Sequence, residues 1–236
     1  MNDLFCIGSS ICSRIAKNWN VDFFKFSRMN KKAVQEVNQL KNKIKRRKNV
    51  LIFLNTNSLV STKKVKKYGG KAHIHKAKRL MRVDRLKTYF RHYQSLIEIL
   101  SDRKIFIVCN MGRCFSPSCD CKDAASFSIV QQLKLFRDIE KGIYKILEKT
   151  GKSAEFMTHQ KLMKNLGRTI LDKKRKSLRC SDVRAIYQFI LGEDNIHPNN
   201  EGLRLLSDVL SDWVRRGTSN NGNRFCNRNR PLGNDL

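Results

Sequence analysis

Two short, wholly apolar runs constrain the fold of this chain more than any other feature. Residues 50–54 (Val-Leu-Ile-Phe-Leu) and 105–109 (Ile-Phe-Ile-Val-Cys) contain no polar or charged residue. Strands with one face in water alternate apolar and polar residues, whereas parallel strands covered on both faces are continuously apolar. Helical patterns of 15 or more residues alternate with the expected strands, so the sequence predicts a parallel sheet between two layers of helices, a three-layer α/β/α fold.

The rest of the chain fits one such domain over residues 1–216. Strands are also expected at 4–7, 21–26 and 155–157. Helices are expected after residues 8–10 as far as 19, and at 31–48, 82–100, 126–149, much of 158–191, and 200–216. A basic insertion covers about 60–80, where residues 61–79 are expected to form a Lys-rich loop without an acidic residue. The Ser, Asn, Gly and Arg content of 217–236 predicts a disordered basic tail.

The charge of the chain indicates a polyanionic partner. Its 49 Lys and Arg residues against 20 Asp and Glu give a net charge of +29. Such an excess opposes compactness by self-repulsion, and binding of nucleic acid explains it better than an anionic membrane surface or compositional drift. Because three separate runs carry this charge and few aromatic residues lie among them, we expect salt-sensitive contacts to the backbone of nucleic acid, most simply RNA. The residues expected to make them are Lys45, Arg46, Arg47, Lys48, Lys63, Lys64, Lys66, Lys67, Lys173, Lys174, Arg175 and Lys176.

The location of the chain follows from what its sequence lacks. It has no apolar run long enough to cross a membrane, and its first residues lack the basic start of a secretory signal. We therefore expect a cytoplasmic or nuclear protein with reduced cysteines. Four cysteines between Cys109 and Cys121 suggest zinc, but their spacing matches no common zinc knuckle, which favours ordinary thiols and no bound metal.

A short segment near the end of the chain carries the chemistry. Asp194 precedes His197 by three residues, and Pro198 and Gly202 lead into an amphipathic helix. In this arrangement a carboxylate can orient an imidazole, and the imidazole can take a proton from a nucleophile elsewhere in the chain.

Two further polar sets follow predicted strands, where the sites of parallel sheets lie. Ser9 and Ser10 come after Gly8, at the start of a helix; each could expose its hydroxyl beside helix N–H groups, or simply cap the helix. Asn55 and Asn57 follow the 50–54 strand, where an amide could donate to an oxyanion or form an Asx turn.

Taken in order, these segments resemble the SGNH (GDSL-type) hydrolase family over roughly residues 4–214. The matching segments are 5–11, 54–58 and 194–202. The resemblance implies a flavodoxin-like sheet and hydrolysis of an acyl ester, commonly an O-acetyl or short acyl group, with no metal and no cofactor. It also implies Ser10 as nucleophile, His197 as general base and Asp194 as its orienting carboxylate, with the Asn57 side chain and the Ser10 N–H as oxyanion donors.

The chain departs from the family pattern at four places. Ser9 stands where the family usually has Asp, and residues 27–30 contain no glycine where the second block of the family supplies one. Asn55 and Ser58 replace the usual Gly and Asp of the third block. A non-catalytic relative, the OSK domain of the insect protein Oskar, uses this fold to bind RNA, so a catalytically inactive RNA-binding module is the alternative function.

Overall fold

The computed structural model confirms the predicted parallel sheet. It describes residues 3–65, 76–81, 83–100, 102–109, 129–171, 178–192 and 197–219. Five strands pair in the order β2-β1-β3-β6-β7, and every neighbouring pair is parallel. Their bounds are β1 Leu4–Gly8, β2 Asp22–Lys25, β3 Asn49–Phe53, β6 Lys104–Val108 and β7 Ala154–Met157.

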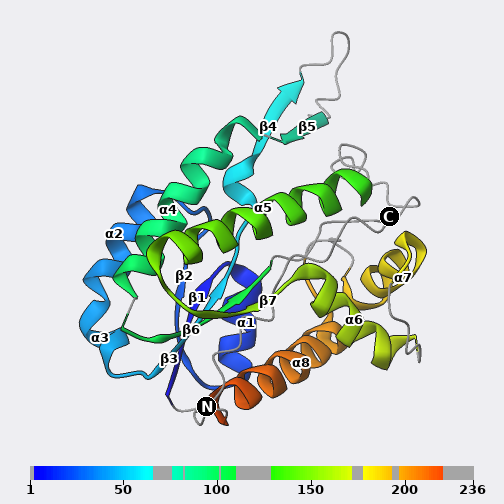
Figure 1. The fold of residues 1–236 in the computed structure, drawn as a ribbon. Coiled ribbons are helices and arrows are strands. Elements are labelled where there is room, and N and C mark those ends of the chain that lie inside the picture. Colours follow the sequence, from blue (N-terminus) through cyan, green and yellow to red (C-terminus); the bar gives the residue numbers. More distant parts are fainter. Residues whose placement is uncertain are drawn as a thin grey trace, which may run out of the picture.

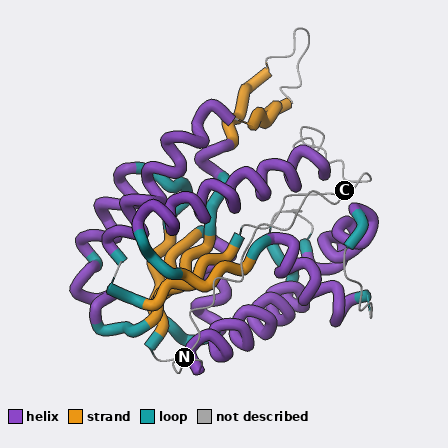
Figure 2. The backbone as a smooth tube through the Cα atoms, in the orientation of Figure 1, coloured by secondary structure: helices purple, strands orange, loops and turns teal. Residues whose placement is uncertain are grey.

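Helices cover both faces of the sheet (Figure 1). One face carries α2 Lys31–Gln39, α3 Lys41–Lys45, α4 Leu86–Ile99 and α5 Ile129–Thr150. The other carries α1 Ser10–Asn18, α6 His159–Ile170, α7 Cys180–Ile190 and α8 Asn200–Ser219. Figure 2 shows the strands as a central layer between these two groups. The fold is therefore the three-layer α/β/α arrangement that the apolar runs predict.

Strand β1 is continuously apolar because it contributes to two cores. In β1, Leu4 and Cys6 belong to the core with α1, α6, α7 and α8. Phe5 and Ile7 belong to the core with α2, α3, α4 and α5. All four are at most 2% exposed. Since successive side chains of a strand point to opposite faces, two covered faces require an apolar residue at every position.

The prediction of a loop over residues 61–79 is wrong for residues 61–65 and 76–79, whereas residues 66–75 lie outside the described residues. β4 Val60–Val65 and β5 Lys76–Met81 form an antiparallel hairpin, which is a two-stranded sheet separate from the main one. Neither strand shows the apolar run or the apolar–polar alternation that marks a strand packed on a core, so its sequence gives no strand signal. In Figure 1 the hairpin projects away from the body beside α4.

Two helix boundaries also differ from the prediction. The helix expected over 31–48 is two helices, α2 and α3, which meet at Leu40. The last helix continues to Ser219, so residues 217–219, expected to belong to the disordered tail, are helical. A side chain at Gly217 would come within 2.5 Å of the Phe106 ring, so this glycine serves close packing of α8 on the sheet. Residues 220–236, with the rest of the predicted tail, lie outside the described residues.

Two one-turn 3-10 helices, η1 Asn57–Leu59 and η2 Val83–Arg85, flank the hairpin in the sequence. Among the described helices, none has the length and apolar character needed to cross a membrane.

Candidate active site

Ser10 follows the carboxyl end of β1 and is the first residue of helix α1. The preceding turn is tight because Gly8 has no side chain: a Cβ there would lie 2.7 Å from the Cβ atoms of both Cys12 and Phe53. Ser9 holds the N-cap position of α1, but its side chain makes no capping hydrogen bond. Ser10 therefore starts a helix whose first N–H groups are not capped by the Ser9 hydroxyl, which suits the binding of negative charge.

The segment that carries His197 is tied to the end of α7. The Gly192 N–H donates to the His197 carbonyl oxygen (2.9 Å), and Leu191 and Pro198 form an isolated β-bridge. The Asn199 N–H donates to the carbonyl oxygen of Ile190 (2.9 Å). These backbone contacts fix the position of the His197 backbone, from which the imidazole extends.

Helix α8, which follows His197, begins in close contact with the end of α7. The Asn199 side-chain oxygen accepts the Gly202 N–H (2.7 Å) and so caps α8. A Cβ at Gly202 would lie 2.1 Å from the carbonyl oxygen of Ile190, so only glycine fits this position. The Pro and Gly of the sequence motif thus position the histidine through backbone packing.

Ser10 and His197, 187 residues apart in sequence, meet at this edge of the sheet. The Ser10 Oγ and His197 Nε2 atoms are 2.9 Å apart, which is hydrogen-bonding distance. Both residues are partly exposed, so the pair is open to solvent and to a substrate. Asp194, the third member of the predicted triad, lies outside the described residues.

The predicted oxyanion region lies beside this pair. β3 is the direct neighbour of β1 in the sheet, and Asn57 begins η1 four residues after β3 ends. Asn57 is described by its backbone alone, so its role as an oxyanion donor stays a prediction.

Two of the departures from the family pattern touch one another. The buried Asn55 side chain donates from Nδ2 to the carbonyl oxygen of Ser27 (3.1 Å), in the segment without the second-block glycine. The Asn55 backbone N–H donates to the Tyr93 hydroxyl oxygen (2.8 Å), and Tyr93 is fully buried. Because burial opposes ionisation, the pKa of Tyr93 is raised, and its neutral hydroxyl serves as a structural partner. The sequence indicates an oxyanion donor, an Asx turn or a replaced glycine at Asn55, and none of these predicts the hydrogen bond to Ser27.

A second polar group that the sequence did not reveal lies where β7 ends. His159 is buried, with its ring stacked on Phe136 and its Nε2 atom 2.8 Å from the Tyr187 hydroxyl. Burial lowers the pKa of His159 to about 3, so its imidazole is neutral at physiological pH. The His159 N–H donates to the Glu140 carboxylate (2.7 Å), and burial raises the pKa of that carboxyl. This group joins α5, α6 and α7 beside the site.

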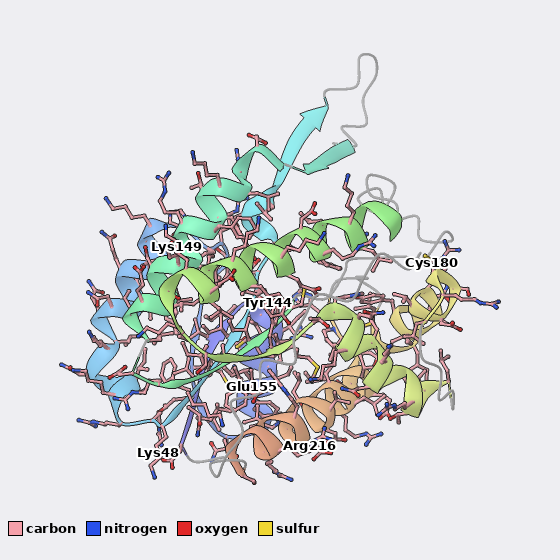
Figure 3. The ribbon with its side chains drawn as sticks, in the orientation of Figure 1. Lys48, Tyr144, Lys149, Glu155, Cys180 and Arg216 are labelled. Carbon is pink, nitrogen blue, oxygen red and sulfur yellow. The ribbon has the colours of Figure 1, made fainter. Side chains whose placement is uncertain are left out.

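The predicted basic residues fall on several elements. Lys45 ends α3, and Arg46, Arg47 and Lys48 lie between α3 and β3, where Arg47 donates to the Asp22 carboxylate (2.8 Å). Hydrogen bonds from Arg47 and Lys43 lower the pKa of Asp22. Lys48 is exposed, as are Lys149 and Arg216 elsewhere on the surface (Figure 3).

The backbone of Lys63 and Lys64 belongs to β4. The remaining six residues of the predicted set lie outside the described residues: Lys66, Lys67, Lys173, Lys174, Arg175 and Lys176.

The zinc hypothesis also falls mostly outside the described residues. Cys109 is buried directly after β6, while Cys114, Cys119 and Cys121 are not described. Within the described part of the chain, no disulfide joins Cys6, Cys12, Cys109 or Cys180, and no three potential ligands gather around a metal position.

Comparison with solved structures identifies the fold. A candidate acylhydrolase from Bacteroides fragilis superposes with a TM-score of 0.50 at 10% identity, over 91% of this chain and 86% of that chain. A GDSL-like lipase from Bacteroides thetaiotaomicron (TM-score 0.49, 10% identity) matches over 91% and 88% of the two chains. A carbohydrate acetylesterase family member from Sinorhizobium meliloti (TM-score 0.48, 10% identity) matches over 92% and 98%. No family model matches the sequence, and the search of curated proteins gives no match. The chain therefore has the fold of the SGNH (GDSL-type) hydrolases.

Proposed function

We propose that this chain is a serine ester hydrolase in which Ser10 is the nucleophile and His197 the general base. The observation that carries the proposal is the 2.9 Å distance between Ser10 Oγ and His197 Nε2. A serine hydroxyl is a weak nucleophile by itself, and a hydrogen-bonded imidazole is the usual group that activates it. A binding module has no need to bring these two side chains together at the carboxyl edge of the sheet.

The pair can carry out both halves of ester hydrolysis. With the imidazole proton on Nδ1, the Ser10 hydroxyl donates to Nε2, and Oγ attacks the acyl carbon as its proton moves to Nε2. The imidazolium then gives this proton to the alcohol oxygen as the ester C–O bond breaks, which leaves an acyl-Ser10. A water molecule repeats the sequence, so the acid is released and Ser10 regains its proton. Asp194 is proposed to hold the Nδ1–H side of the ring.

The negative charge that develops on the carbonyl oxygen needs fixed donors. We assign them to the Ser10 N–H, at the start of α1, and to the side chain of Asn57. Removal of one such donor costs about 10²–10³ in rate in serine hydrolases.

The substrate class proposed is an O-acetyl or short acyl ester. Acylhydrolase chemistry attributed to the Bacteroides fragilis protein of the same fold agrees with this proposal. At 10% identity the agreement is an analogy between folds, and the residues of the site carry the argument.

Hydrolysis of p-nitrophenyl acetate tests the proposal. We expect Ser10→Ala to reduce kcat about 10⁶-fold, to a small residual rate, and Asp194→Asn to lower it about 10⁴-fold because the imidazole loses its orienting partner. Ser9→Ala is the matched control, since the Ser9 side chain caps nothing and the neighbouring backbone is the same. Equal rates for the wild type and Ser10→Ala would refute the proposal and leave the inactive RNA-binding module as the better hypothesis.

We also propose that the chain binds nucleic acid through phosphate contacts. Even if every acidic residue paired with one basic residue, 29 positive charges would remain without an internal counter-charge. The logarithm of the affinity should then fall linearly with the logarithm of salt concentration, with a slope of about −0.7 per phosphate contacted on a single strand. A flat plot from fluorescence anisotropy of labelled RNA would contradict this second function.

A further inference from the structure

The β4–β5 hairpin is a separate two-stranded sheet that follows β3 in the chain, beyond the carboxyl edge of the main sheet, where the candidate active site lies. It starts directly after η1, whose first residue is Asn57, and it returns to η2 and α4. Its strands of six residues each extend about 20 Å at the usual rise of a strand. Figure 1 shows it standing clear of the main sheet.

The charge of the hairpin conflicts with its stability as an isolated element. Residues 60–83 contain nine Lys or Arg and no Asp or Glu. Lys63 and Lys78 are register partners in the ladder, and like charges directly opposite each other destabilise a pair of strands. A two-stranded hairpin without further packing is marginal in water. A bound polyanion would remove this repulsion.

The ladder also distributes the charge over both faces of the ribbon. Register partners share a face and successive residues alternate, so Lys63 and Lys78 lie on one face and Lys64 and Arg79 on the other. A flat membrane surface would meet only one of them. A polynucleotide can contact both, either by wrapping around the ribbon or because the major groove of a duplex admits a two-stranded β-ribbon. Since strands 60–65 and 76–81 contain no aromatic residue, the contacts would be to phosphates rather than to stacked bases.

We infer that the β4–β5 hairpin is a nucleic-acid-binding ribbon that holds a polynucleotide at the mouth of the Ser10–His197 site. Only the placement at the Ser10–His197 site rests on the proposed function, because binding by the ribbon does not depend on catalysis. The position is argued from the topology: β4 follows β3 through residues 54–59, and β3 is the direct neighbour of β1, the strand that precedes Ser10. A polynucleotide, or a group attached to one, is then the class of molecule brought to the nucleophile.

Neutralisation of the ribbon tests the binding. The full chain with Lys63→Gln, Lys78→Gln and Arg79→Gln loses three charges from the hairpin, and its affinity for a fluorescein-labelled single-stranded RNA and for a duplex DNA is measured from 50 to 300 mM KCl. If all three contact phosphates, the salt slope for RNA becomes shallower by about two, which weakens binding about a hundredfold at 0.1 M salt.

The control removes the same charge from another place. Lys141, Lys145 and Lys149 are exposed on α5, and their replacement by Gln should change the slope by much less. Equal losses in the two triple variants would overturn the inference, since the charge would then act diffusely. Capture of the wild type by phosphatidylserine vesicles, without RNA binding, would also overturn it.

Inhibition of ester hydrolysis by RNA tests whether the hairpin holds the polynucleotide at the Ser10–His197 site. Unlabelled RNA should inhibit p-nitrophenyl acetate hydrolysis by the wild type with a midpoint near its Kd, and should inhibit the hairpin variant only at about a hundredfold higher concentration. RNA that binds through the hairpin without any change in turnover would overturn the placement. If no variant hydrolyses the ester, the proposed function fails, while the binding comparison still decides whether the hairpin is the ribbon.

Discussion

Gly202 offers the sharpest test of how the histidine is positioned. In Gly202→Ala the new Cβ would lie 2.1 Å from the carbonyl oxygen of Ile190 and 2.8 Å from its Cα and carbonyl carbon. All three are backbone atoms, so no side-chain rotation relieves the contact. The start of α8 and the end of α7 must separate by about 1 Å to reach ordinary van der Waals distance.

This separation should reach the active site through the backbone contacts of the His197 segment. Asn199, three residues before Gly202, donates to the same Ile190 carbonyl (2.9 Å), and Gly192 donates to the carbonyl of His197 (2.9 Å). Displacement of a catalytic group by 1 Å costs about a hundredfold in rate, and overpacking costs about 1–3 kcal/mol of stability. We therefore expect kcat for p-nitrophenyl acetate to fall about a hundredfold in a protein that still folds.

Gly192→Ala is the matched control, because it makes the same change in the same segment. A Cβ at Gly192 would lie 3.5 Å from the His197 carbonyl oxygen, an ordinary contact, so kcat should stay within a factor of about three of the wild type. Circular dichroism and thermal unfolding of both variants separate displacement from loss of fold. A folded Gly202→Ala protein with wild-type kcat would refute the reasoning that Gly202 positions His197.

Two further predictions concern buried polar groups. Asn55→Ala removes the donor to the Ser27 carbonyl, so we expect kcat to fall about tenfold or more with little change in KM. Tyr93→Phe should mainly lower the free energy of unfolding, by about 1–3 kcal/mol. Equal kinetics in both variants would contradict a positioning role of the Asn55 side chain. The pKa of buried His159 is lowered to about 3, so between pH 6.5 and 3 the unfolded chain binds a proton that the native state does not, and the free energy of unfolding should fall by about 1.4 kcal/mol per pH unit on acidification. His159→Gln, which keeps a polar partner for Tyr187, should lose this part of the pH dependence in urea titrations at pH 7 and 5; an unchanged difference would exclude His159 as its source.

The sheet was predictable because its cause is visible along the chain. Burial on both faces forces apolar residues at 50–53 of β3 and at 105–108 of β6, and this leaves a continuous apolar run in the sequence. The β4–β5 hairpin leaves no such signal, because its strands pair with each other in a separate two-stranded sheet. An apolar run in a sequence reports burial on both faces of a strand, and a pair of strands outside the main sheet does not require it.

The site was predictable where short segments hold their own geometry. Gly8 and Gly202 stand where other atoms approach the backbone closely. In the sequence, Gly8 indicates a fixed turn before Ser10, and Gly202 indicates a fixed helix start after His197. His159 gives no comparable signal, because it lies between polar residues in the sequence and its burial comes from α5 and α7. No local pattern distinguishes a buried histidine from an exposed one when the covering residues are far away in the chain.

The relation between Asn55 and Ser27 shows why departures from a motif are better judged in pairs. Taken singly, Asn55 replaces a glycine of the third block, and residues 27–30 lack the glycine of the second. In the structure the Asn55 side chain reaches across the carboxyl edge of the sheet to the Ser27 carbonyl (3.1 Å). A glycine at 55 could not make this bond, because it has no side chain. A residue other than glycine at 27 and 28 also has fewer backbone conformations than glycine. Both changes therefore act in the same direction: they restrict the segment that follows β2 at the carboxyl edge of the sheet.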